Sequence, residues 1–184
     1  MVGVTGDGKV LRTVFTPWRL KYILGFKNKK GKKRCFLCDA AEHPEHDAEN
    51  LVLYRGRNAF IIMNRYPYNT GHLLIAPYRH VGDWLELTPE ERAEIAELIA
   101  FAEEKLRELL APDGFNVGIN IGAVAGAGLP GHVHVHIVPR WKGDTNFLPV
   151  VSDVRLVPEN VEGTYERLRP LFSGNDQDQK KSKE

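Results

Sequence analysis

Three histidines stand at every second position of residues 131–141, which read GHVHVHIVPRW. Successive side chains of an extended strand point to opposite faces, so His132, His134 and His136 would share one face and the apolar residues between them the other. Imidazole titrates near neutrality, so neighbouring rings can divide the roles of nucleophile, donor and orienting group. The alternative interpretation is a surface strand whose polar face meets water.

A glycine-rich segment, GAVAGAGLPG at residues 122–131, leads directly into the histidines. Glycine has no Cβ, so backbone N–H groups of such a loop can approach an anion closely and cradle a phosphate. A tight connection between two strands would favour glycine as well. The loop and the three histidines together indicate phosphate chemistry.

The hydrophobic pattern predicts the elements that would position these residues. Thr88, Pro89 and Glu91 have the spacing of a capped helix start, and apolar residues at helical spacing continue to Leu109. Short connections between β-rich segments favour an antiparallel sheet, so the predicted fold class is α+β with a long helix packed on the sheet. Strands are expected at residues 51–55, 59–64, 71–77, 115–121 and 132–140.

Composition limits the class of protein. The 184 residues are 42% hydrophobic and 27% charged with a net charge of +1, which suits one globular domain and gives no general reason to expect a nucleic-acid or membrane partner. No apolar stretch approaches the ~20 residues needed to span a membrane, and the start of the chain lacks a secretory signal, so we expect a cytoplasmic protein.

The chain divides by composition into three parts. Residues 1–34 form an extension in which Pro17 predicts a short helix to Leu24 and residues 27–34 are strongly basic. Residues 35–172 form the catalytic domain, and residues 173–184 lack apolar periodicity and predict a disordered tail. A nucleic-acid deadenylase that uses the basic run is one functional alternative, and its binding would depend steeply on salt.

The segment HVHVHIV resembles the signature of the histidine triad (HIT) superfamily of nucleotide hydrolases and transferases. NRYPYNTGHLLIAPYRH and GFNVGINIG resemble upstream HIT segments, so the similarity covers residues 35–141. FTPWRLKY and PRWKGDTNFLPVV resemble the bacterial diadenosine tetraphosphate phosphorylase branch. The resemblance implies a HIT-like fold, a nucleotide substrate and a homodimer with a continuous sheet.

The resemblance also implies roles for individual residues. His134 would attack the α-phosphate and form a nucleotidyl-enzyme that water or orthophosphate then cleaves, with His136, His132 and His72 completing the catalytic set. Nucleotide binding is expected from Asn64 at the ribose, from Asn120 near the phosphates or leaving group, and from Gly126 and Gly128 of the loop. An asparagine at a strand end often closes a turn, which is the structural alternative for Asn64.

The chain departs from the family pattern just before the triad. Residues 128–131 read Gly-Leu-Pro-Gly, where the family commonly has Ser, Thr or Gln. The resemblance therefore assigns no side chain of this loop as the donor to the phosphate or leaving group. The activity it implies is cleavage of a dinucleoside polyphosphate such as diadenosine tetraphosphate. The alternatives are a nucleoside phosphoramidase acting on adenosine monophosphoramidate and a nucleotide-binding regulatory HIT protein.

Cys35 and Cys38 form a C-x-x-C pair, which in a reducing compartment fits half of a zinc site. Local histidines at positions 43 and 46 could complete it. Resemblance to HIT proteins and to galactose-1-phosphate uridylyltransferases instead implies His80 and His132, with a structural zinc ion that pins the N-terminal segment to the catalytic strand. We favour the second set over the first and over two buried thiols without metal. No organic cofactor is expected.

Overall fold

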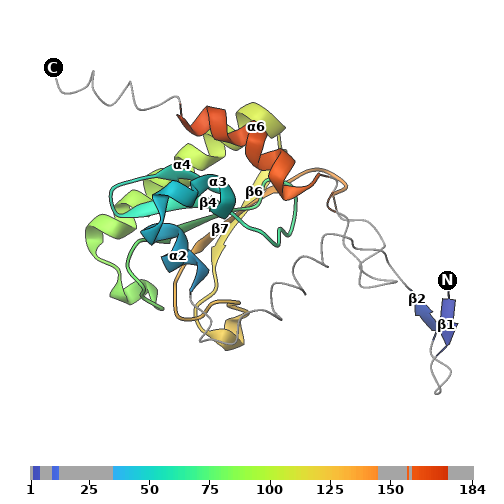
Figure 1. Cartoon of the computed structure of the whole chain (residues 1–184), viewed down its shortest axis with the longest axis horizontal. Helices are drawn as coiled ribbons and strands as arrows, with labels where there is room; N and C mark the ends of the chain where they lie inside the picture. The colour runs from blue at the N-terminus through green and yellow to red at the C-terminus, as the bar shows by residue number, and fades with distance from the viewer. Residues whose placement is uncertain (1, 5–9, 13–34, 145–156, 158, 174–184) are drawn as a thin grey trace. The chain divides into compact units, whose positions relative to one another are not determined.

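The computed structural model describes residues 2–4, 10–12, 35–144, 157 and 159–173 (Figure 1). The chain divides into two compact units, Met1–Arg34 and Cys35–Glu184. In the first unit, β1 (Val2–Val4) and β2 (Val10–Arg12) pair as antiparallel strands. The predicted helix at residues 17–24, the basic run at 27–34 and residues 174–184 of the predicted tail lie outside the described residues.

A five-stranded antiparallel sheet is the centre of the second unit. Its strand order is β3-β4-β5-β7-β6, so β7 lies between β5 and β6 although it is last in the chain. The predicted α+β class is confirmed, and each of the five predicted strand segments overlaps a strand of the sheet. The strands are β3 (Val52–Arg55), β4 (Ala59–Met63), β5 (Leu73–Pro77), β6 (Gly114–Ile119) and β7 (Val135–Arg140).

The start of β7 differs from the prediction. Residues 132–134 precede the strand, so the expectation that all three triad histidines lie on one regular strand is wrong. The neighbouring strand ends at Pro77, whose nitrogen carries no hydrogen for the ladder. The Val133 N–H instead donates to the carbonyl oxygen of Val81 at 2.7 Å. The first two histidines therefore lie in a segment that the loop after β5 holds in place.

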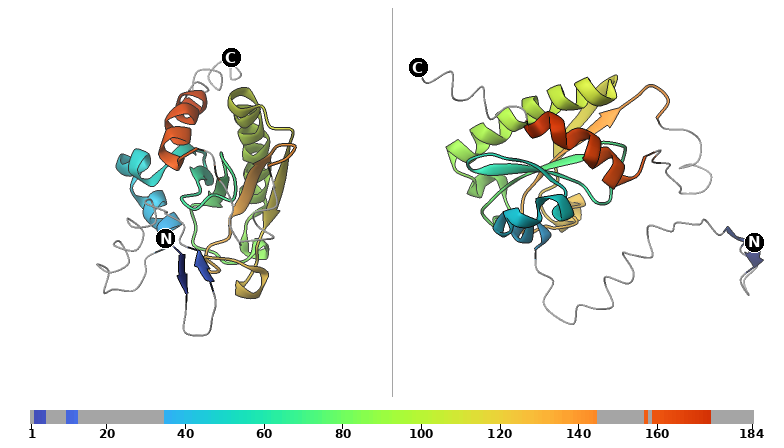
Figure 2. Two further views of the ribbon diagram at one scale, coloured as in Figure 1. Left: turned by 90° about the vertical axis from the view of Figure 1, so that its right-hand side faces the viewer. Right: turned by 45° about the horizontal axis from the view of Figure 1, so that its top comes forward.

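Helix α4 (Pro89–Leu110) covers one face of the sheet. The predicted capping box is present, because Thr88 Oγ1 accepts from the Glu91 N–H and the Glu91 carboxylate accepts from the Thr88 N–H. Helix α6 (Val161–Ser173), which the sequence pattern did not predict, lies on the same side as α4 (Figure 2). Its last turn includes the first residue of the predicted disordered tail. The α4 residues that enter the core are Ile95, Leu98, Ala102 and Leu106.

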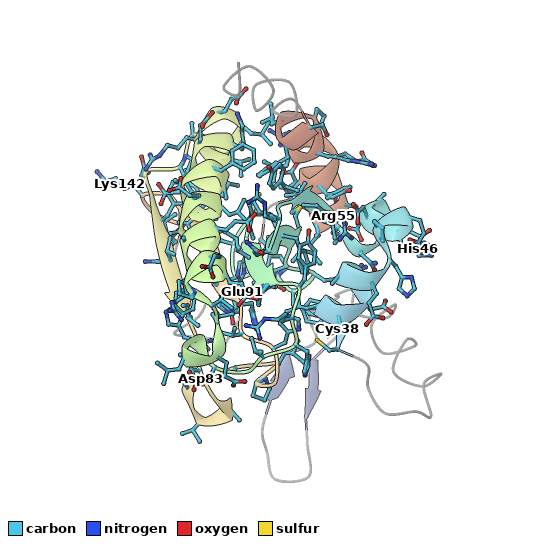
Figure 3. The ribbon with its side chains drawn as sticks, turned by 90° about the vertical axis from the view of Figure 1, so that its left-hand side faces the viewer. Cys38, His46, Arg55, Asp83, Glu91 and Lys142 are labelled. Atoms are coloured by element: carbon cyan, nitrogen blue, oxygen red, sulfur yellow. The ribbon has the colours of Figure 1, made fainter. Side chains whose placement is uncertain are left out.

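The other face of the sheet carries a shorter helical segment. It consists of α2 (Phe36–Glu42), η1 (Pro44–His46) and α3 (Asp47–Asn50), and Figure 3 shows it on the opposite side of the strands from α4. Leu37 and Ala40 of α2 pack with Phe60 and Leu74 in a second apolar cluster. Two 3-10 turns, η2 (Trp84–Glu86) and η3 (Ala123–Ala125), lie in connections. Within the described residues, no helix has the length and apolar composition to cross a membrane.

Candidate active site and metal cluster

Strand register places His136 on the sheet face that carries α2. His136 on β7 stands opposite Leu74 of β5 and Gly118 of β6, while Ile137 joins the core beneath α4. His132 is 0% exposed and His134 is 7% exposed. The interpretation of a polar face open to water is therefore wrong for these two residues, and each buried ring needs hydrogen-bond partners.

The hydrogen bonds of His72 and His136 determine their tautomers. The backbone N–H of Tyr68 donates to His72 Nδ1 at 3.0 Å, so that nitrogen carries no proton. His72 Nε2 lies 3.0 Å from His136 Nδ1, and it must therefore donate its proton to that atom. His136 is left with Nε2 as its protonated nitrogen. One backbone amide thus fixes the orientation of two imidazoles in succession.

A single hydrogen bond fixes the tautomer of His134. Its Nδ1 lies 2.8 Å from the carbonyl oxygen of His132, which can only accept, so Nδ1 carries the proton. The lone pair is consequently on Nε2, and the ring packs edge-on against His136 with centroids 4.9 Å apart. A neutral imidazole fixed in this tautomer can attack an electrophilic phosphorus atom.

Burial keeps these rings neutral. It is the largest cause that lowers the pKa of His72 to about 3 and that of His136 to about 4, and each is lowered further by neighbouring triad histidines. Burial also lowers the pKa of His134, partly offset by the bond to the His132 carbonyl. The three rings are therefore neutral imidazoles at neutral pH, each with one N–H group and one unprotonated nitrogen.

Asn64 and Tyr68 support the His72 ring. Asn64 Oδ1 accepts from the Tyr66 N–H at 2.9 Å, and its Nδ2 lies 3.3 Å from His72 Nδ1. Asn64 thus closes a turn, the structural alternative considered for it, and its contact with a ribose stays a prediction. The Tyr68 ring stacks on His136 with centroids 5.7 Å apart.

A cavity of about 200 Å³ adjoins His136. Asn120, predicted near the phosphates, is part of its wall, and Asn120 Nδ2 reaches the Gly126 carbonyl oxygen at 3.5 Å. Gly126 has a φ of +88°, which favours glycine there, whereas a Cβ at Gly128 would meet no atom within 4 Å. The structure thus brings Asn120 and Gly126 together, while Gly128 lies in open space.

Cys35, Cys38, His80 and His132 converge into one cluster. Their ligand atoms all lie within 4.8 Å of one another, and the His132 Nδ1 lies 3.3 Å from Cys35 Sγ and 3.5 Å from Cys38 Sγ. In a tetrahedral zinc site, sulfur and nitrogen ligands lie about 3.5 Å apart. His132 Nε2 donates to the Pro77 carbonyl oxygen at 2.9 Å, which leaves Nδ1 unprotonated toward the sulfur atoms. Donor types, tautomer and spacing therefore fit Zn²⁺.

The local alternative for the metal site is wrong. His43 Nδ1 lies 3.0 Å from Glu45 Oε1, and His46 Nδ1 lies 3.1 Å from Glu49 Oε2, on the surface of η1 and α3. Figure 3 shows Cys38 and His46 on different parts of this helical segment. Neither histidine belongs to the cluster that contains the cysteines.

Sequence reasoning missed several residues that shape the site. The Tyr68 amide could not be found from residue type, because it acts through its backbone. Asn116 also lines the cavity, and Arg140 donates a hydrogen bond to the Asn116 side chain. A signal for Asn116 was present, since residues 116, 118 and 120 alternate along a predicted strand that ends at a predicted site residue.

Comparisons with known proteins show the family to which this chain belongs. A family model described as HIT domain matches residues 45–143, which include the triad, His72 and His80, while the two cysteines precede it. The chain belongs to this family, so the sequence resemblance and the HIT-like fold are confirmed. A crystal structure of a zinc-bound histidine triad family protein from Mycobacterium smegmatis aligns with a TM-score of 0.62 and 30% identity, covering 80% of this chain and 99% of that one.

Two curated relatives carry more specific names. AP-4-A phosphorylase of Mycobacterium tuberculosis is 36% identical over 162 residues, which are 86% of this chain and 83% of the relative. Bis(5'-nucleosyl)-tetraphosphatase [asymmetrical] of Schizosaccharomyces pombe is 32% identical over 126 residues, 68% of this chain and 65% of the relative. These are names of enzymes, which confirms the prediction that the chain is a HIT-family enzyme.

Proposed function

We propose that this protein cleaves dinucleoside polyphosphates such as diadenosine tetraphosphate through a covalent nucleotidyl-His134 intermediate. The observation that carries the proposal is the 2.8 Å bond from His134 Nδ1 to the His132 carbonyl oxygen, which directs the lone pair to Nε2. The names of the relatives, a phosphorylase and a tetraphosphatase, support the substrate class.

The first step is attack by His134 Nε2 on the α-phosphorus of the substrate. A nitrogen–phosphorus bond forms, and the bond from phosphorus to the bridging oxygen breaks with its electron pair on the leaving polyphosphate. The Nδ1–H bond to the His132 carbonyl stabilises the positive charge that develops on the ring. The Nε2–H of His136, the adjacent ring, is the donor best suited to the phosphate oxygens.

The second step releases the nucleotide. An oxygen of water, whose proton passes to the solvent, or an anionic oxygen of orthophosphate attacks the same phosphorus, and the nitrogen–phosphorus bond breaks with its electron pair returning to Nε2. Because burial holds the ring neutral, the enzyme returns to its starting state without an additional base for His134. Asn64, Asn120 and the loop residues Gly126 and Gly128 are proposed to bind the nucleotide.

We further propose that Cys35, Cys38, His80 and His132 bind a structural Zn²⁺ ion. Bound zinc would supply a cross-link and no catalytic chemistry, because all four ligand positions are protein atoms. The cross-link would join residues 35 and 38 to the segment that supports the nucleophile. Two thiols in this arrangement also suit the reducing cytoplasm, which is the proposed location.

A homodimer through the edge strand β6 is the proposed assembly. β6 is the last strand of the five-stranded sheet, and its Val117 side chain is 44% exposed. An apolar groove of about 430 Å³ lies beside it, between β6 and α4. A second copy that added its β6 would continue the sheet and cover this groove. Light scattering on the purified protein measures the assembly.

The test of the activity is incubation with diadenosine tetraphosphate, with and without orthophosphate, and chromatography of the nucleotides. ATP and ADP that appear only with phosphate identify a phosphorylase, whereas ATP and AMP without phosphate identify a hydrolase. No turnover under either condition would refute the proposal. A phosphoramidase would instead cleave adenosine monophosphoramidate in a parallel assay.

A variant of the nucleophile separates an enzyme from a nucleotide-binding regulatory protein. His134→Asn is expected to reduce turnover by at least about 10³-fold and to keep much of the nucleotide affinity. His46→Asn makes the same exchange at an exposed residue of η1 and is the matched control. Turnover by His134→Asn at the wild-type rate would exclude the covalent mechanism.

A further inference from the structure

The loop before the triad leaves one requirement of phosphate chemistry unassigned. Its residues 128–131, Gly-Leu-Pro-Gly, carry no hydroxyl or amide side chain. A phosphate that enters beside His136 would need donors to its oxygens, because an anion taken out of water is stabilised only by such partners. A side-chain donor to such a phosphate must therefore come from another element near His136.

The cavity beside His136 contains such a side chain. Residues directly opposite each other in an antiparallel pair share a face, and Asn116 stands opposite Val138, next to the pair formed by Gly118 and His136. Asn116 of β6, Asn120 just after this strand and Tyr68 line the same cavity. At about 200 Å³ it is smaller than the roughly 300–1,000 Å³ of pockets for larger organic ligands, so its size suits a small anion.

The amide of Asn116 is fixed with its donor end free. Arg140 Nη1 donates to Asn116 Oδ1 at 2.7 Å, which identifies the oxygen and leaves Nδ2 with two N–H groups. Within the part of the chain that the structure describes, Nδ2 has no acceptor. Two N–H groups of one amide are thus available on the face that borders the cavity.

Arg140 cannot easily rotate away from Asn116. Its Nε and Nη2 donate to the two carboxylate oxygens of Asp144 at 2.6 and 2.7 Å, a bidentate contact. Asp144 is itself held by the Trp141 N–H at 3.1 Å and by Asn69 Nδ2 at 2.9 Å. Because Asp144 also balances the charge of Arg140, the feature that these residues give the cavity is the direction of the Asn116 amide.

We infer that Asn116 binds the orthophosphate that accepts the nucleotidyl group, and that Arg140 and Asp144 position its amide. This inference rests on the proposed function, because that function supplies the reaction in which orthophosphate takes part. An orthophosphate oxygen would attack the phosphorus on His134, the new oxygen–phosphorus bond would form, and the bond to Nε2 would break to give a nucleoside diphosphate. Asn116 would then act as a specificity residue that favours phosphate over water.

The experiment measures orthophosphate binding directly, by calorimetric titration of the full-length protein without nucleotide. N116D replaces the N–H groups with a negative oxygen at nearly constant shape, and is expected to weaken phosphate binding about 10- to 100-fold. N116A removes the donors without adding charge and is expected to weaken it less. The matched control is N50D, which adds the same charge in α3, beside β3 at the opposite edge of the sheet.

A variant of Gly118 fills part of the cavity without removing a donor. A Cβ at Gly118 would meet no atom within 4 Å, so G118A should fold normally and place a methyl group on the cavity face. It is expected to weaken phosphate binding several-fold. Circular dichroism and thermal melting of each variant show that it is folded. Unchanged phosphate affinity in both N116D and G118A would overturn the inference, as would wild-type protein that binds no orthophosphate at millimolar concentration.

The positioning role of Arg140 has its own readout. If Arg140 acts through Asn116, R140K weakens phosphate binding in the wild-type background and adds little in the N116A background. Equal losses in both backgrounds would refute this role, whatever R140K does to stability. Because binding is measured without turnover, phosphate binding that depends on Asn116 would support the inference even if diadenosine tetraphosphate were not cleaved. Failure to cleave diadenosine tetraphosphate would refute the proposed function and leave the inference about Asn116 standing.

Discussion

A buried neutral histidine makes the free energy of unfolding depend on pH. His72 should show this effect most clearly, because its pKa is lowered to about 3. The His72 side chain is 0% exposed, and burial is the main cause that lowers its pKa to about 3. In the unfolded chain its pKa returns to about 6.5. Between these values the unfolded state binds a proton that the folded state does not. The free energy of unfolding therefore falls as the pH falls below about 6.5.

The magnitude follows from the two pKa values. One pH unit in this window costs about 1.4 kcal/mol per histidine, so at pH 5 His72 alone should reduce the free energy of unfolding by about 2 kcal/mol relative to pH 8. Replacement by glutamine removes the titrating group and keeps an amide that can donate toward His136. Between pH 8 and pH 5, we expect the free energy of unfolding to fall by about 2 kcal/mol less in His72→Gln than in wild type.

The assay is equilibrium unfolding in urea at pH 8 and pH 5, followed by tryptophan fluorescence. Wild type and His72→Gln share the same four residues of the proposed zinc site, so pH effects on these residues cancel in the comparison. Ile61→Val, a core exchange at a fully buried residue, is the control, because it should cost about 1 kcal/mol equally at both pH values. An equal pH-dependent loss in wild type and His72→Gln would refute the assignment of a buried, neutral His72.

Three further predictions concern packing, capping and metal. Gly71→Ala should lower the free energy of unfolding by about 3 kcal/mol in urea titrations, because its φ is +74° and a Cβ would lie 2.6 Å from Leu110 Cδ1; a loss below about 1 kcal/mol would contradict this. Thr88→Ala should lower Tm by about 2–4 °C through loss of the cap, and Thr88→Ser should restore it. Cys38→Ser should abolish stoichiometric zinc measured by elemental analysis, whereas His46→Asn should not; the reverse pattern would exclude the proposed cluster.

Local signals account for the parts of the fold that the sequence predicted. The start of α4 needs only Thr88, Pro89 and Glu91, which interact within one helical turn. Strand segments and the histidine motif are local as well. The α6 helix is different, because Gly163 and Pro170 weaken its helical signal. It depends on burial of side chains that contact β3 and α4, a tertiary effect that no local pattern contains.

The residues of the site also fall into those that the sequence predicted and those that depend on contacts between distant parts of the chain. His134 and His136 were predicted from their spacing and family resemblance, and the Cys2His2 set from resemblance. The predicted start of β7 was wrong because the true start depends on contacts with Val81 and Pro77, which lie more than 50 residues earlier in the chain. The roles of Tyr68 and Asn116 depend on contacts with His72 and with Arg140, so residue type alone could not assign them.

The position of β7 in the sheet has a consequence for synthesis of the protein. A chain emerging from the ribosome can pair β3, β4 and β5 in order, but β6 pairs only with β7, which is made later. At about 5–20 residues per second, β6 and the exposed edge of β5 wait for a partner while the glycine loop is translated. β7, which His134 immediately precedes, then enters between β5 and β6, so the residues that close the last gap in the sheet are those that directly follow His134.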